Sequence, residues 1–300
     1  MENLKLNDMK ASEFIFNPDD NKKLKDYDSG CTGDFKNKKD ACESLKEGVA
    51  LLAELQEKLY AYDKYGMLII LQALDAAGKD GIIKHVLTAV NPQGCQVKSF
   101  KAPSAEELDH DFLWRCFKAL PERGNIGIFN RSYYEDVLVT RIHPQLLVKA
   151  KVPNLPKNPE KSDKFWKTRF QDIVNFEKYL VNNGIVVVKF FLNVSADEQK
   201  RRFLERVNNP EKHWKFSPSD LKERGHWDKY QDAYHEIFKH TSTDFAPWYV
   251  IPADHKWFTR TAVCEIINNE LLKLKLHFPK VSEELKAEID NAREVLSKEE

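Results

Sequence analysis

The sequence has few cysteines and no long apolar run. Its five cysteines are scattered singly and none forms a Cys-x-x-Cys pair, which argues against a zinc site and a disulfide scaffold and indicates a reducing compartment. No apolar run reaches the roughly eighteen residues of a membrane-spanning helix, so we expect no membrane partner. No signal peptide opens the chain, and we therefore expect a cytoplasmic protein.

An excess of either charge is also missing, since 47 basic residues balance 47 acidic ones. A generally basic surface is thereby excluded and no nucleic-acid partner is expected, so any site for a polyanion must come from local clustering of cations. The 300 residues can bury a large core, as one elaborated domain or as one domain with a lid.

Apolar runs typical of buried strands alternate with helical patterns along the chain. Strands are predicted at residues 67–71, 95–100, 126–129, 185–192 and 248–251. Helices are predicted at residues 40–62, from 82 onward, and at 104–120, 166–183, 196–207, 219–239, 257–276 and 281–296. This alternation predicts an α/β fold with a parallel sheet. Residues 1–38 are polar and irregular, and we expect them to form a loosely packed arm.

The first predicted strand runs into a small-residue turn that contains a single lysine, and a helical pattern follows. The turn resembles the phosphate-binding pattern Gly-x4-Gly-Lys-Ser/Thr, with Ala73 in place of the first glycine and Asp80 in place of the hydroxyl residue. Backbone N–H groups and the helix N-terminus can surround phosphate oxygens there. The residues expected to do so are Ala76, Ala77, Gly78, Lys79, Asp80 and Gly81. An ordinary turn that caps a helix is the alternative.

Two side chains of this turn are candidates for phosphoryl-transfer chemistry. Such chemistry depends on positioning and charge neutralisation more than on covalent steps. Lys79 can bridge phosphate oxygens and Asp75 can hold magnesium, although a turn-stabilising role explains Asp75 equally well.

A second polar cluster follows the apolar strand at 126–129. Ligands of open α/β sheets bind at the carboxyl ends of the strands, so Arg131 and one or more carboxylates are expected opposite the phosphate loop. Carboxylate and phosphate oxygens are preferred ligands of Mg²⁺. A solvated, salt-bridged helix start is the alternative.

A third cluster, at residues 196–230, holds nine Lys/Arg against seven Asp/Glu. Because the excess of positive charge is small, a role in binding anions depends on where these residues lie. On a helix Arg202 and Arg206 share one face. A charge run of this kind is usually a solvated face, but beside a phosphate loop it is typical of the mobile arginine lid of a nucleotide kinase.

Six segments, in this order, resemble the polyphosphate kinase 2 family and are most similar to its class III branch, which phosphorylates both AMP and ADP. They are DAAGKDG (75–81), NPQG (91–94), HDFLWR (110–115), FNRSYYED (129–136), NPEKHWKF (209–216) and WYVIPAD (248–254). The resemblance implies a P-loop kinase with a three-layer α/β/α core, a central parallel sheet and a helical lid. The core would span 45–276, with the lid inserted at about 196–240, an N-terminal arm at 1–44 and a C-terminal helix at 277–300.

The resemblance also implies a reaction and its participants. A homodimer or homotetramer would transfer phosphoryl groups reversibly from inorganic polyphosphate to AMP and ADP, giving ADP and ATP. The transfer would depend on Mg²⁺, with Mn²⁺ as an alternative. The residue patterns alone, without the resemblance, leave two other functions open. These are an ATP-dependent nucleoside monophosphate kinase and a non-catalytic module that binds polyanions or nucleotides.

Site residues carry over from the family motifs position by position. Asp75 and Lys79 match the Walker A segment, and Asn130, Arg131 and Glu135 match the Walker B-like segment. Related classes have aspartate where Asn130 stands, so Glu135 is the compensating carboxylate and, with Asp75, the expected metal ligand. The residues expected to contact polyphosphate from the lid are Arg202, Arg206, Lys212, Lys215 and Arg224.

Overall fold

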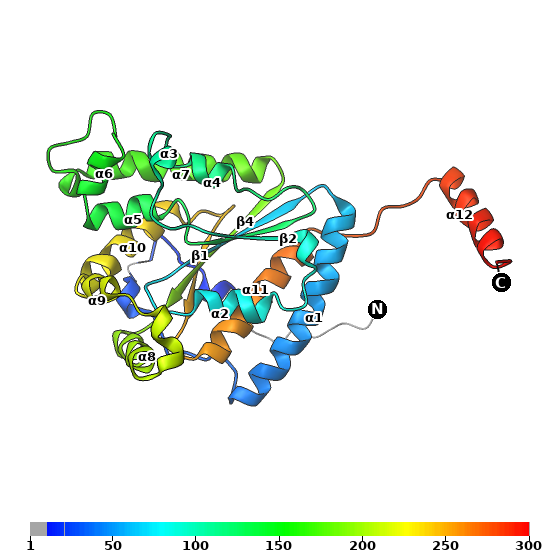
Figure 1. Ribbon diagram of the computed structural model, residues 1–300, viewed down its shortest axis with the longest axis horizontal. Helices are drawn as coiled ribbons and strands as arrows, with labels where there is room; N and C mark the ends of the chain where they lie inside the picture. The colour runs from blue at the N-terminus through cyan, green and yellow to red at the C-terminus, as the bar shows by residue number, and fades with distance from the viewer. Residues whose placement is uncertain (1–10, 21, 300) are drawn as a thin grey trace.

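A computed structural model describes residues 11–20 and 22–299, and it has three layers, with a parallel sheet between two layers of helices (Figure 1). The sheet has five strands in the order β2-β3-β1-β4-β5, and every neighbouring pair is parallel. The strands are β1 (Gly66–Gln72), β2 (Cys95–Ser99), β3 (Ile126–Asn130), β4 (Ile185–Asn193) and β5 (Trp248–Pro252). The predicted α/β fold with a parallel sheet is confirmed.

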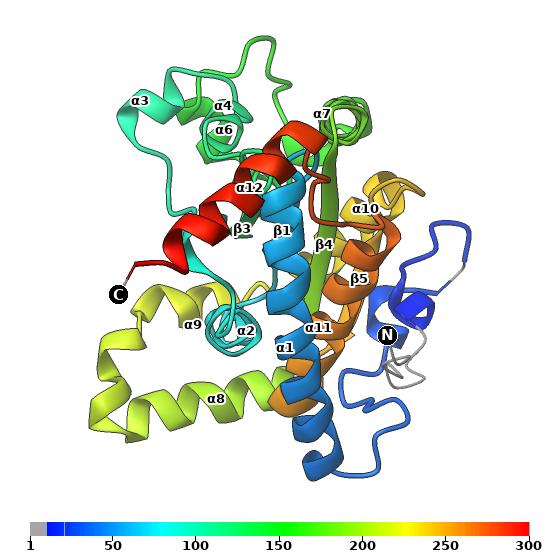
Figure 2. The same cartoon turned by 90° about the vertical axis from the view of Figure 1, so that its right-hand side faces the viewer.

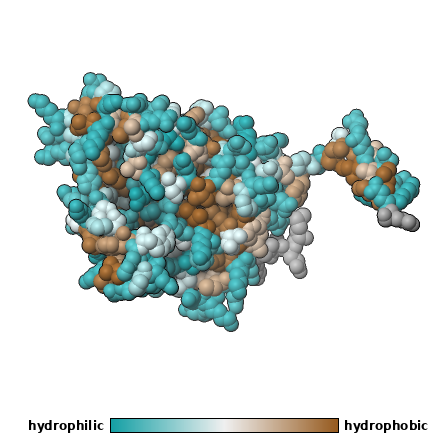
Figure 3. Space-filling view, viewed as in Figure 1, coloured by the Kyte–Doolittle hydropathy of each residue, from teal (hydrophilic) through white to brown (hydrophobic). Residues whose placement is uncertain are grey.

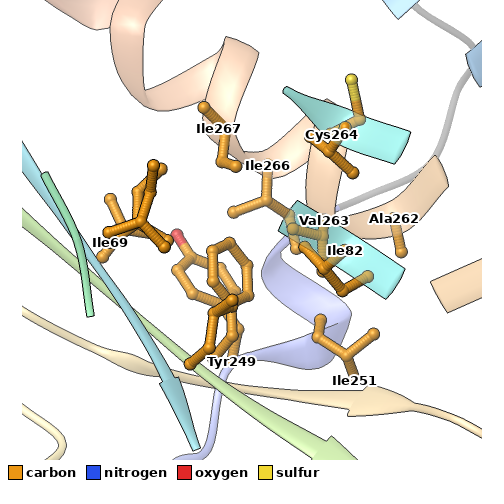
Figure 4. Packing of buried hydrophobic residues seen from close by; sticks show 14 of the residues in the cluster. Ile69, Ile82, Tyr249, Ile251, Ala262, Val263, Cys264, Ile266 and Ile267 are labelled. Carbon is orange, nitrogen blue, oxygen red and sulfur yellow. The ribbon is translucent and has the colours of Figure 1, made fainter. Parts of the chain in front are cut away.

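The central strand β1 is buried along its whole length because helices cover both faces of the sheet. One face carries α1 (Lys38–Tyr62), α2 (Lys79–Val86) and α11 (Lys256–Lys273), and the other carries α5 (Glu135–Ile142), α7 (Asp163–Asn182) and α10 (Trp227–Thr241). Successive residues of β1 alternate between two apolar clusters, Ile69 in the first and Ile70 in the second. Figure 4 shows Ile69 and Tyr249 of the sheet against Ile266 and Ile267 of α11.

The remaining helices are short or lie outside these two layers. They are α3 (Ala105–Leu108), α4 (Trp114–Phe117), α6 (Gln145–Lys149), α8 (Ala196–Asn208), α9 (Pro218–Arg224) and α12 (Glu283–Leu296). Short segments of 3-10 helix are η1 (Ala11–Phe14), η2 (Leu24–Asp26), η3 (Pro92–Gly94), η4 (Pro159–Lys161) and η5 (Pro210–Lys215).

Two of the predicted helices are interrupted in the structure. The helix expected at 104–120 begins as expected with a capping box at Ser104, but it divides into α3 and α4. The carboxylate of Asp111 accepts the backbone N–H of Leu113, and such local bonds compete with helix continuation. The helix expected at 219–239 divides into α9 and α10 around Gly225, a residue type with low helix propensity.

The described part of the N-terminal arm is packed rather than loose, which corrects the sequence-based expectation. Phe14, Phe16 and Leu24 are buried, and the backbone N–H of Phe16 donates to the Trp248 carbonyl at 2.8 Å. Ile15 forms an antiparallel bridge to Tyr249, so the arm covers the open edge of β5. Residues 1–10 of the expected arm lie outside the described residues.

The C-terminal helix α12 lies apart from the body of the molecule (Figure 1). None of its residues is buried, and apolar side chains including Leu285 and Ile289 are exposed on it (Figure 3). In the described part of the chain, no helix combines the length and apolarity that crossing a membrane requires.

The strand order places a ligand crevice beside β1 and β3. The chain leaves β1 toward β2 on one side and leaves β3 toward β4 on the other, so the connections diverge between two neighbouring strands. Such a switch point opens a crevice at the carboxyl ends of the strands. Leu71 of β1 is level with Asn130 of β3, so the phosphate loop and the second polar cluster emerge together.

Candidate active site

The phosphate loop, residues 75–81, connects β1 to α2. Gly78 has φ of 118°, a conformation open to glycine, and directly precedes Lys79 at the start of α2. The Lys79 ammonium donates to the Ala73 carbonyl at 2.9 Å. Burial, and then the positive charge of Arg131, lower the pKa of Lys79 to about 8. Lys79 is thus held inside the loop, and no carboxylate among the described residues forms an ion pair with it.

Two side-chain hydrogen bonds connect the loop to the segment after β3. The Arg131 guanidinium donates to the Asp75 carboxylate at 2.9 Å. The Asn130 amide donates to the Asp80 carboxylate at 3.0 Å. Arg131 itself has a positive φ of 64°, and its backbone N–H donates to the Leu71 carbonyl at 3.0 Å. The structure thus brings together the loop and the cluster that the sequence placed opposite each other.

A cleft of about 370 Å³ opens over the phosphate loop, and we name it the phosphate cleft. It is strongly cationic. Its basic lining residues are Lys79, Arg131, Arg202, Arg206, Lys212, Lys215, Lys256 and Arg260, and its acidic ones are Asp75, Asp80 and Glu205. The projecting lid elements α8 and α9 lie beside α2 (Figure 2). Lys256 and Arg260 of α11 were missed from the sequence, although two basic residues four apart at a helix start are a usable signal.

A second cavity of about 250 Å³, which we name the aromatic cavity, adjoins the first. It shares Asp75 and Arg131 with the phosphate cleft. Its other lining residues are Ala73, Leu74, Glu135, Leu138, Val139, Gln199, Ser219, Asp220, Glu223, Arg224, Trp227, Tyr230 and Tyr234. Asp75 and Arg131 therefore lie where a cationic space meets an aromatic one.

Arg202 has a different position from the other lid cations. Its side chain is 4% exposed, and its guanidinium donates to the carbonyls of Ala76, Ala77, Ala253 and Asp254 and to Glu198. These bonds use all five donors of an arginine. Arg202 consequently braces the back of the phosphate loop against the end of β5 and has no donor left for a ligand.

The remaining lid cations divide between the two spaces. Lys212 pairs with Glu205, and the Lys215 ammonium lies 4.8 Å from the centre of the Trp214 ring. Arg206 makes two long hydrogen bonds, to the Lys215 carbonyl at 3.4 Å and to the Asp220 carboxylate at 3.5 Å. Arg224 instead faces the aromatic cavity, where it donates to the Gln199 side chain at 2.6 Å.

Within the described residues no group of three or more His, Cys, Asp or Glu side chains is arranged to hold a metal unaided. That fits a site for Mg²⁺, which is usually bound by one or two carboxylates together with substrate phosphates. Asp75 can serve from either space, Glu135 from the aromatic cavity and Asp80 from the phosphate cleft. The structure adds Asp80 as a candidate because its carboxylate lies directly beside Asn130.

A buried network fixes the segment between Arg131 and Glu135. Lys189 and Glu177 are fully buried and paired at 2.6 Å. The Glu177 carboxylate also accepts the hydroxyls of Tyr133 at 2.8 Å and Tyr134 at 2.7 Å. A buried ion pair between α7 and β4 thus holds the turn that presents the second polar cluster.

A lysine-bearing phosphate loop at the switch point of a parallel sheet, lined by basic residues of neighbouring helices, defines a P-loop phosphotransferase. The particular family follows from comparison of the whole chain. The chain belongs to the family described as Polyphosphate kinase 2 (PPK2), whose profile matches residues 35–278.

Named relatives cover most of the chain. The chain is 49% identical over 264 residues to the ADP-polyphosphate phosphotransferase of Rhodopseudomonas palustris, covering 88% of this chain and 90% of that protein. It is 43% identical over 263 residues to the AMP/ADP-polyphosphate phosphotransferase of Meiothermus ruber, covering 87% and 93%. The crystal structure of polyphosphate kinase 2 from Arthrobacter aurescens superposes with a TM-score of 0.86 at 41% identity, covering 95% of this chain and 96% of that one.

Proposed function

We propose that this protein transfers phosphoryl groups reversibly from inorganic polyphosphate to AMP and ADP, giving ADP and ATP. The observation that carries the proposal is the pair of cavities that meet at Asp75 and Arg131. One suits a polyanion and the other a nucleotide, and relatives of this chain are named as AMP- and ADP-polyphosphate phosphotransferases.

The phosphate cleft is the proposed path of the polyphosphate chain. Its cations come from the lid, with Arg206, Lys212 and Lys215, and from α11, with Lys256 and Arg260. Contacts between lysine or arginine and a polyanion release counterions, so binding in this cleft should weaken as salt rises, by analogy with nucleic acids.

The aromatic cavity is the proposed place of the acceptor nucleotide. Trp227 and Tyr230 offer aromatic faces to the base, and Leu138 offers apolar contact. The acceptor's terminal phosphate would then lie at Arg131, facing the phosphate cleft. Arg224 lines this cavity and is assigned to the nucleotide rather than to polyphosphate.

In the proposed step a terminal phosphate oxygen of the nucleotide attacks the terminal phosphorus of polyphosphate. The bond from that phosphorus to its bridging oxygen breaks, and the shortened chain leaves with the electron pair. Lys79 and Arg131 are placed to stabilise charge on the transferred group. No strong general base is required, because the attacking phosphate is already anionic.

Kinases that transfer phosphoryl groups act with a divalent metal, and we propose Mg²⁺ here, with Mn²⁺ as an alternative. When bound, the metal would neutralise charge on the phosphates. Asp75 would hold it, with Glu135 or Asp80 as the second carboxylate.

Supplying AMP and polyphosphate in the absence of ATP tests the proposal. Formation of ADP and then ATP is the expected result. An ATP-dependent nucleoside monophosphate kinase would form ADP only when ATP is supplied, and a binding module would form neither product with either donor.

A homodimer or homotetramer is proposed as the working assembly. The exposed apolar side chains of α12 support this, because such a helix face is usually covered by a partner surface, here a second copy of the chain. Light scattering of the full chain, compared with a chain ending at residue 278, tests it. The cytoplasmic location stays a prediction.

A further inference from the structure

The hydroxyl of Tyr234 is an exception among the buried tyrosines. Tyr234 is 1% exposed, and its hydroxyl has no hydrogen-bond partner in the part of the chain that the structure describes. By contrast, the buried Tyr133 and Tyr134 both donate to Glu177, and Tyr249 donates to Glu270 at 2.8 Å. Buried phenols normally find a partner, so a missing one requires an explanation.

Tyr234 lies on α10 and lines the aromatic cavity together with Asp75, Arg131 and Glu135. It therefore lines the same cavity as Asp75 and Arg131, the two residues that the cavities share. Burial first, and then the negative charge of Glu135, raise its pKa well above the usual range. The phenol consequently stays protonated and remains a hydrogen-bond donor. A donor that lines the aromatic cavity suits an anionic oxygen, which Arg131 also favours.

We propose that the Tyr234 hydroxyl donates a hydrogen bond to a phosphate oxygen of the acceptor nucleotide, beside the Arg131 guanidinium. This inference rests on the proposed function, because it takes the aromatic cavity as the nucleotide site. It makes Tyr234 a substrate-contacting residue whose partner arrives only with the ligand. That explains why the hydroxyl is unpaired in the protein alone.

The Tyr234→Phe variant separates this role from a structural one. Because the hydroxyl has no partner within the described residues, removing it should leave the melting temperature of the free protein unchanged. A lost hydrogen bond to a charged group should lower kcat/KM for AMP by about ten- to a hundredfold. The KM for polyphosphate should stay within about twofold of wild type, since Tyr234 lines the aromatic cavity and not the phosphate cleft.

Tyr249→Phe is the matched control, because Tyr249 is also buried but donates to Glu270 on the far side of the sheet. It should lower the melting temperature and leave kcat/KM for AMP unchanged. An unchanged kcat/KM in Tyr234→Phe overturns the proposal. So does an equal loss toward AMP and polyphosphate accompanied by a lower melting temperature, which would indicate a structural role.

Calorimetric titration of AMP into both proteins distinguishes this inference from the proposed function. Weaker AMP binding by Tyr234→Phe than by wild type supports the contact even if polyphosphate is not the donor. Equal AMP affinity together with equal kcat/KM refutes the contact even if polyphosphate-driven turnover is present.

Discussion

Replacing Arg202 by methionine removes the guanidinium that braces the phosphate loop and keeps an apolar stem of similar length. In the wild type this group satisfies carbonyl oxygens of the loop and of the segment after β5, including Ala77 at 2.7 Å and Ala253 at 2.6 Å. In the variant these buried carbonyl oxygens lose their hydrogen-bond donor. It also removes one of two partners of Glu198, whose carboxylate keeps Arg201.

The expected magnitude is large. Removing one partner of a buried ion pair lowers the free energy of unfolding by about 3–5 kcal/mol. We expect the lower end of that range because Glu198 retains its ion pair with Arg201. Arg206→Met is the matched control on the same helix. The Arg206 side chain is 22% exposed and its contact to Asp220 is 3.5 Å long, so the variant should change the free energy of unfolding by about 0–1 kcal/mol.

Urea denaturation followed by tryptophan fluorescence measures both variants, and steady-state kinetics measures their KM for polyphosphate. Arg202→Met should lose stability and turnover together, whereas Arg206→Met should raise the KM for polyphosphate at nearly unchanged stability. If Arg202→Met were as stable as wild type and raised only that KM, Arg202 would be a ligand contact, as the sequence suggested, and the bracing role would be refuted.

Four further predictions concern the phosphate loop, the lid and the metal. Lys79→Met should lower turnover about 10²–10³-fold relative to wild type in steady-state kinetics, which is the usual loss for one preorganised donor. The pKa of Lys79 falls from 10.5 to about 8 on folding, so the unfolded chain binds more protons between these pH values. The free energy of unfolding of the wild type should therefore rise between pH 8 and pH 10.5, by at most about 3 kcal/mol. Denaturation of Lys79→Met at both pH values should lack that rise. The double change Lys212→Ala and Lys215→Ala should raise the KM for polyphosphate far more than the KM for AMP, and it should flatten the salt dependence of the KM for polyphosphate. Equal effects on both substrates, in kinetics at two salt concentrations, would contradict the polyphosphate path. Glu135→Gln should raise the Mg²⁺ concentration for half activity if Glu135 is the second metal ligand, whereas a shift in Asp80→Asn alone would assign that ligand to Asp80.

The sequence predicted the sheet and the phosphate loop because their signals are local. Apolar runs such as the one at 126–129 identify buried strands without knowledge of their neighbours, and all five predicted strands are present. The breaks inside two predicted helices were not predicted. The turn at Asp111 depends on a side-chain bond that competes with an otherwise acceptable helical pattern.

The parts of the site that the sequence missed depend on contacts between distant segments. Arg202 and Arg206 share a helix face, and only the tertiary structure shows that Arg202 is turned to the loop carbonyls while Arg206 faces the cleft. Lys256 and Arg260 reach that cleft because β5 places the start of α11 beside α2. Their spacing at a helix start marks them as candidate cations, but it does not predict which cleft they reach.

The central claim is that a phosphoryl group passes directly between two cavities that meet at Asp75 and Arg131. Initial rates measured over a matrix of AMP and polyphosphate concentrations, with Mg²⁺ and without ATP, test it most directly. Direct transfer requires both substrates to be bound at once, so the account predicts intersecting double-reciprocal lines. Parallel lines, which indicate a phosphorylated enzyme intermediate, or the absence of ADP at every polyphosphate concentration, would contradict it.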